Sequence, residues 1–222
     1  MPAPGFLPFM RFCVLFLLAN ILFFSRNIQA QSGTGTLEDW NPGYLVTLDE
    51  DSLYGPISIL YQNDLVQIND ENRVKTFGAN QISMVYIRDR QNSENERYIY
   101  PFPYHPYSDF KPQRFFEMLF SGLHLSLLCR EILVTETVPQ YDNFTFRTYF
   151  STRTRLQKEF YFMFPGKKVR LISNSKKDLL IQLSDKKTEM KMFLSEKNLS
   201  PDNLEDLTKI VVEYNRLKIE KQ

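Results

Sequence analysis

The sequence predicts an α+β protein in which an N-terminal part, either an antiparallel β-sheet or a barrel-like arrangement of strands, is followed by C-terminal amphipathic helices. Three observations predict this class. Short β-rich segments alternate with polar turns between residues 43 and 173. The hydrophobic period then changes to that of a helix near Ser173. The composition, with 43% hydrophobic residues, 27 basic and 26 acidic side chains, is that of a folded protein.

The strands are predicted from β-rich segments that flank short polar connections. Asp49–Ser52 separates the first two segments, and a four-residue connection of this kind is typical of a hairpin. Residues 101–112 contain four prolines and predict an extended crossing between strands. Eleven candidate segments are found, from which roughly nine or ten short antiparallel strands are expected. The expected segments are Tyr44–Leu48, Leu53–Tyr61, Leu65–Ile68, Val74–Phe77, Ile82–Ile87, Tyr98–Tyr100, Phe115–Phe120, Leu123–Arg130, Phe144–Phe150, Phe160–Phe164 and Val169–Ile172.

Two of the turns are predicted from their residue types. Ser121-Gly122 is a two-residue connection typical of a tight turn, and Pro165-Gly166 favours a type II turn. A further polar loop is expected around Pro139–Asn143.

The helical segment begins where Ser175 and Asp178 make a candidate capping box. A second short helix is expected over residues 188–197. In the last helix Ser200 is the expected cap and Pro201 the first helical residue. One face of this helix is apolar, which predicts that it docks on the sheet or binds a partner. The stripe consists of Leu204, Leu207, Ile210, Val211, Tyr214 and Leu217.

Residues 1–30 are typical of a secretory signal peptide, because Arg11 precedes the apolar run Phe12–Phe24 and a polar stretch follows. The apolar run is short for a membrane span, and an uncleaved anchor is the alternative. Residues 31–42 are then a flexible lead, 43–173 the antiparallel β domain, and 174–222 a helical segment packed on it. The expected location is the periplasm, the cell surface or the extracellular space.

No catalytic, cofactor-binding or metal-binding residues are predicted. Cys13 leaves with the signal, so Cys129 is a single thiol, either in the core or in an intermolecular disulfide. His124 lies on the opposite face of the predicted strand, which argues against a Cys–His dyad. His105 has no carboxylates at metal-ligand spacing, and the acidic turn Asp49–Asp51 lacks the pattern of a calcium loop.

Aromatic residues are in excess around the proline-rich crossing. Tyr104, Tyr107 and Phe110 form a candidate aromatic binding surface there, suited to sugars or to a protein partner. The alternative interpretation is that such rings pack in the β core.

Two stretches resemble a known group of proteins. GYLVTLDEDSLYGPISI, residues 43–59, and the C-terminal residues 176–217 are similar to uncharacterised secreted proteins of Bacteroidota. The resemblance implies an exported envelope protein and supplies no activity and no catalytic residues. Asp51-Ser52-Leu53 also resembles the O-glycosylation signal of such bacteria.

The expected function is that of a non-enzymatic periplasmic or cell-surface binding module, whose partner is an envelope protein or a glycan. The alternative is a hydrolase of envelope or other glycans, whose carboxylates a sequence does not reveal. Balanced charge gives no support for nucleic-acid binding. The polar C-terminus Lys221-Gln222 does not resemble the closing strand of a transmembrane barrel. The oligomeric state is not predicted.

Overall fold

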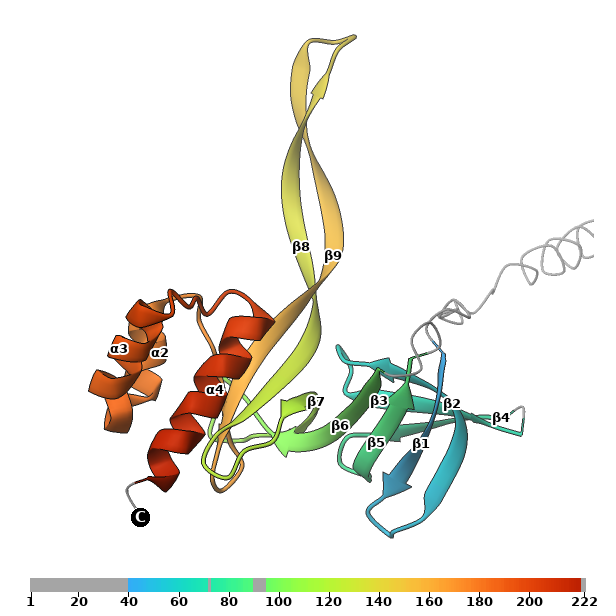
Figure 1. Ribbon diagram of the computed structural model, residues 1–222. Coiled ribbons are helices and arrows are strands. Elements are labelled where there is room, and N and C mark those ends of the chain that lie inside the picture. Colours follow the sequence, from blue (N-terminus) through green and yellow to red (C-terminus); the bar gives the residue numbers. More distant parts are fainter. Residues whose placement is uncertain (1–39, 72, 90–94, 221–222) are drawn as a thin grey trace, which may run out of the picture. The chain divides into compact units, whose positions relative to one another are not determined.

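The computed structural model describes residues 40–71, 73–89 and 95–220, and these residues confirm the α+β class. The predicted signal peptide and residues 31–39 of the lead lie outside the described residues. Ten antiparallel strands form one sheet in the order β10-β9-β8-β7-β6-β5-β1-β2-β3-β4 (Figure 1). The strands are β1 (Asn41–Thr47), β2 (Ser52–Leu60), β3 (Leu65–Asp70), β4 (Arg73–Gly78), β5 (Ile82–Arg88), β6 (Glu96–Pro103), β7 (Gln113–Phe120), β8 (Ser126–Asp142), β9 (Arg147–Phe164) and β10 (Lys168–Leu171).

Of the two forms expected for the β part, the structure has the antiparallel sheet, which is open and not closed into a barrel. β4 and β10 are its two edge strands, and no strand pairing among the described residues joins them. The C-terminal helices cover part of the sheet instead, so its apolar side chains are buried without closure.

Three clusters of buried side chains make up the core. Alternate residues of a strand point to opposite faces, so neighbouring residues contribute to different clusters. Leu127 of β8 packs under the helices, whereas Leu128 packs with Phe116 and Tyr161. The third cluster lies among β1 to β7 and includes Leu45.

The hairpin between β1 and β2 was predicted and is present. Its register places Gly43 opposite Gly55. A Cβ atom at Gly43 would lie 2.1 Å from the carbonyl oxygen of Tyr86 on β5, so glycine permits the close approach of these strands.

The described helices are α2 (Lys176–Gln182), the short 3-10 turn η2 (Ser184–Lys186), α3 (Lys187–Glu196) and α4 (Leu204–Ile219). Ser175 caps α2 by accepting a hydrogen bond from the Asp178 amide, as predicted. None of the helices described is both long enough and apolar enough to cross a membrane.

The start of α4 differs from the prediction. Asn203, not Ser200, is the N-cap, and its side chain accepts a hydrogen bond from the Asp206 amide at 2.8 Å. The Asp206 carboxylate accepts from the Ser200 amide at 2.9 Å, which holds Pro201 in a turn before the helix. The predicted docking of α4 is confirmed: Leu207, Ile210, Val211 and Tyr214 pack with buried residues of β8, β9, α2 and α3.

Part of the proline-rich crossing belongs to a strand, which corrects the prediction for residues 101–103. β6 continues to Pro103 and pairs with β7, with Pro101 opposite Phe115. The pairing of β6 with β5 ends at Ile99. Residues 100–103 therefore have a strand on one side only, where a proline is tolerated.

The prediction of a polar loop around residues 139–143 was also wrong, because these residues belong to the long hairpin of β8 and β9 or to the turn that joins them. Pro139 lies inside β8 instead of in a loop, and β8 and β9 pair continuously from Ser126↔Met163 to Asp142↔Arg147 (Figure 1). The neighbouring strands β7 and β10 pair only with the sheet-side ends of β8 and β9, and past them the two strands continue as a two-stranded ribbon. No described strand lies on the outer side of β8 at Pro139, so a residue without an amide hydrogen is tolerated there. The tight turn expected at Ser121-Gly122 is replaced by a longer connection, and β8 begins only at Ser126.

Candidate functional site

Four tyrosines form a row across four adjacent strands, and this tyrosine row is the strongest candidate site. Tyr54 of β2, Tyr44 of β1, Tyr86 of β5 and Tyr98 of β6 lie directly opposite one another in the strand register. Their ring centroids are 5.5, 5.0 and 5.3 Å apart in that order. Cross-strand aromatic pairs of this kind stabilise a sheet and also create a continuous aromatic surface.

The row lies on the face of the sheet that points away from the core. Leu45, next to Tyr44, and Val85, next to Tyr86, are fully buried, so the tyrosines point to the opposite face. The two end members are the most accessible: Tyr54 is 69% exposed and Tyr98 38% exposed.

A charged pair lies at the Tyr98 end of the row. Glu96 accepts hydrogen bonds from the hydroxyls of Tyr86 at 2.7 Å and Tyr98 at 3.2 Å, and it pairs with Arg88 at 3.3 Å. The hydrogen bond from Tyr86 is the main reason that the pKa of Glu96 is lowered, so this carboxylate is ionised at neutral pH. The site thus combines rings, hydroxyls, a carboxylate and a guanidinium group.

This chemistry suits a ligand that presents apolar C–H faces and hydroxyl groups at the same time. A tyrosine ring offers a large, rigid apolar surface, and its hydroxyl both donates and accepts hydrogen bonds. The row spans three strand spacings, or about 14 Å, which is long enough for several sugar units.

The candidate surface at Tyr104, Tyr107 and Phe110 is divided by the structure. Tyr104 packs edge-on against Phe116 and Tyr161, with centroids 5.7 and 5.2 Å away. Tyr107 is 93% exposed and Phe110 is 78% exposed. The three residues therefore do not form a single flat surface, and Phe110 instead lines a groove.

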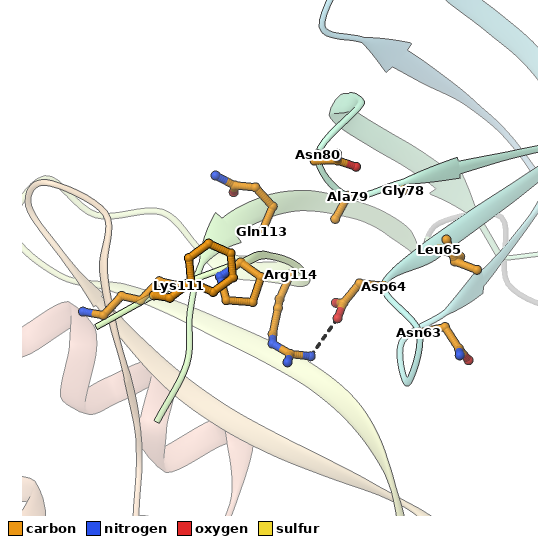
Figure 2. Close-up of a pocket in the computed structure, with 11 residues that line it drawn as sticks. Asn63, Asp64, Leu65, Gly78, Ala79, Asn80, Lys111, Gln113 and Arg114 are labelled. Carbon is orange, nitrogen blue, oxygen red and sulfur yellow. Dashed lines mark hydrogen bonds and ion pairs between the residues drawn. The ribbon is translucent and has the colours of Figure 1, made fainter. Parts of the chain in front are cut away.

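The groove has a volume of about 590 Å³ and lies beside β7. Residues 63–65, 78–80 and 110–114 line it (Figure 2). Side-chain amides, Lys111 and Arg114 contribute polar groups to its lining, and Phe110 adds a ring. Asp64 is the one carboxylate among these lining residues, and Arg114 reaches it at 2.8 Å (Figure 2).

Asp64 is held by an ion cluster that leaves it little freedom for chemistry. Its carboxylate accepts hydrogen bonds from Arg130 at 2.6 Å and from the Phe115 amide at 3.1 Å, in addition to Arg114. Arg130 is buried and also donates to the carbonyl oxygens of Phe115, at 3.0 Å, and Tyr61. The cluster joins the β2–β3 turn to β7 and β8, and its role is structural.

Cys129, the one cysteine among the described residues, lies in the core, which is the first of the two alternatives that the sequence left open. Cys129 is buried in β8, and burial raises the pKa of its thiol to about 12. His124 precedes the strand, and its amide donates to the Asn215 side chain. Among the described residues no group of three or more histidine, cysteine, aspartate or glutamate side chains could hold a metal ion.

No protein-family model, curated protein or solved structure matches the chain.

Proposed function

We propose that the protein is an exported, non-enzymatic binding module that holds a glycan against the tyrosine row. The observation that carries the proposal is the alignment of four tyrosine rings across β2, β1, β5 and β6, with the Glu96–Arg88 pair beside them. The signal-like segment 1–30 and the resemblance to secreted Bacteroidota proteins support export.

The alternative, a hydrolase of glycans, finds less support in the groove. General acid–base cleavage uses two carboxyl groups about 5 to 10 Å apart. Among the residues that line the groove Asp64 is the one carboxylate, and two arginines and a backbone amide hold it. A binding role fits the described geometry better.

Binding of the labelled protein to an array of linear glycans tests the proposal. We expect binding to at least one glycan class, and a loss of roughly tenfold or more when Tyr54 or Tyr98 is replaced by alanine, because each removes an accessible ring from the row. Tyr107→Ala is the matched control, since this tyrosine is 93% exposed and lies outside the row.

Two results would overturn the proposal. One is the absence of binding to every glycan class. The other is a loss of binding in Tyr107→Ala with none in Tyr54→Ala, which would place the site at the proline-rich crossing. Circular dichroism of each variant separates a lost contact from a lost fold.

Export is tested independently by mass spectrometry of the protein from the cells that make it. We expect an N-terminus at or near Gln31 in the protein recovered outside the cytoplasm. A cytoplasmic protein that retains residues 1–24 would contradict export.

A further inference from the structure

The ribbon formed by residues 132–142 of β8 and 147–157 of β9 has one face without any charge. Directly opposite residues share a face, and Thr135 lies opposite Thr154 with their hydroxyls 3.5 Å apart. All ten residues of this uncharged face are exposed. They are Leu133, Thr135, Thr137, Pro139, Tyr141, Thr148, Phe150, Thr152, Thr154 and Leu156.

The opposite face of the ribbon carries its charges. Arg155 is paired with Glu136 at 2.7 Å. Arg147 and Arg153 make no ion pair with any residue that the structure describes, although Arg153 lies opposite Glu136 and Arg147 opposite Asp142 in the register. Two arginines are therefore available on this face for a further negative charge.

The outer edge of β9 is free along the ribbon. β10 pairs with β9 only from Tyr161 to Phe164, and no described strand lies beside residues 147–159. Such an edge presents unpaired amide and carbonyl groups to an additional strand. Between Arg147 and Lys158 this edge strand has four basic residues and no acidic one.

A second copy of the chain does not fit this edge through its own β9. Antiparallel pairing of two β9 edges would bring basic residues together, which disfavours pairing. Packing two uncharged faces would cover about 26 by 10 Å on each copy, or roughly 500 Å² in total, well below the 1,200 Å² or more of stable interfaces. The charge of the edge instead complements an acidic strand.

We propose that the free edge of β9 binds an extended segment of a partner protein in which acidic residues alternate with uncharged ones. Backbone pairing along residues 147–158 provides the attachment. The acidic positions of the segment lie beside Arg147 and Arg153, and the uncharged positions extend the face that contains Phe150 and Leu156. This site is separate from the tyrosine row and does not depend on glycan binding.

The probe is a fluorescent peptide of about ten residues, long enough for a typical strand, in which glutamate alternates with valine and threonine. We expect fluorescence anisotropy to show binding that is roughly tenfold tighter than for a peptide with lysine at every glutamate position, and that weakens with added salt. A central proline in the acidic peptide should reduce the affinity, because it cannot complete the strand pairing.

Variants of the protein locate the site. The double change Arg147→Glu and Arg153→Glu should reverse the preference, so that the lysine peptide binds more tightly. Both residues are exposed, so the fold should persist. Arg73→Glu on β4, the other edge strand, is the matched control and should leave the preference unchanged.

Several outcomes would overturn the inference: no binding of the acidic peptide, equal binding of both peptides, or a preference reversed by Arg73→Glu. Tighter binding of a single-stranded DNA oligomer than of the acidic peptide would assign the edge to nucleic acid. A dimer in sedimentation experiments that the double change dissociates would assign it to a second copy.

Discussion

Replacing Asp64 by asparagine should destabilise the protein strongly, because Asp64 is the one carboxylate among the described residues that forms an ion pair with buried Arg130. The Arg130 side chain is 7% exposed and lies 2.6 Å from the Asp64 carboxylate. Asparagine keeps the size of the side chain and tolerates the positive φ of 53° at this position, so the change isolates the charge. Arg114, with 30% of its side chain exposed, should contribute little.

The expected loss is about 3 to 4 kcal/mol, the lower part of the range for removing one partner of a buried ion pair. For a domain of this size that corresponds to a fall in melting temperature of about 6 to 16 °C. Urea unfolding and thermal melts followed by circular dichroism measure both quantities. Asp70→Asn is the matched control, because its pair with Lys75 at 2.6 Å is more exposed than the Asp64–Arg130 pair, with 29% and 45% of the two side chains accessible, and should contribute less than about 1 kcal/mol.

A double-mutant cycle with Arg130→Met tests the cause. If the ion pair is responsible, Asp64→Asn should cost much less in the Arg130→Met background. A loss for Asp64→Asn no greater than that for Asp70→Asn would refute the reasoning, and so would equal losses in the two backgrounds.

Three further predictions concern the helices and the core. Ile210→Asp places an unpaired carboxylate in the core and should lower the free energy of unfolding, followed by a thermal melt, by several kcal/mol. The control Lys209→Ala, at an exposed residue, should cost about 0.5 kcal/mol or less. Similar losses for the two variants would contradict the docking of α4. The Cys129 thiol should react slowly with a thiol reagent in the native protein and quickly after denaturation, because it is buried and its pKa is about 12; rapid native labelling would show exposure. Asn215→Ala removes the hydrogen bonds that its side chain makes to the backbone amide and carbonyl groups of buried Leu125, and it should cost about 2 kcal/mol or more in urea unfolding. A loss below about 0.5 kcal/mol would mean that water replaces the Asn215 side-chain amide.

The sequence allowed prediction of the parts of the fold that depend on neighbouring residues. The hairpin between β1 and β2 follows from a polar turn between two β-rich segments, and the cap at Ser175 follows from the residue types at its own helix terminus. Prolines misled the prediction, because Pro101 and Pro139 occupy positions with a strand partner on one side only. Whether a strand segment has one neighbour or two is a property of the assembled sheet.

The candidate site was missed for a related reason. Tyr44 meets Tyr86 only because β1 pairs with β5, although three strands, β2 to β4, separate them in the sequence. The ion cluster likewise joins Asp64 to Arg130, which are 66 residues apart. A tyrosine in each of four predicted strands was the one available signal, and these tyrosines become a row only once the register is known.

The position of the tyrosine row is set by the core on the other side of the same strands. Tyr44 and Tyr98 each precede a residue that is fully buried, Leu45 and Ile99 respectively, and Tyr86 follows fully buried Val85. A shift of one residue in the register of any of these strands would turn its tyrosine into the core and expose the aliphatic side chain. Such a shift is unfavourable, because it would remove apolar surface from the core. The aromatic surface is therefore held by packing before any ligand arrives, which reduces the entropic cost of binding to it. For this reason substitutions at Tyr54 and Tyr98, at the accessible ends, should alter binding while the register and the core remain intact.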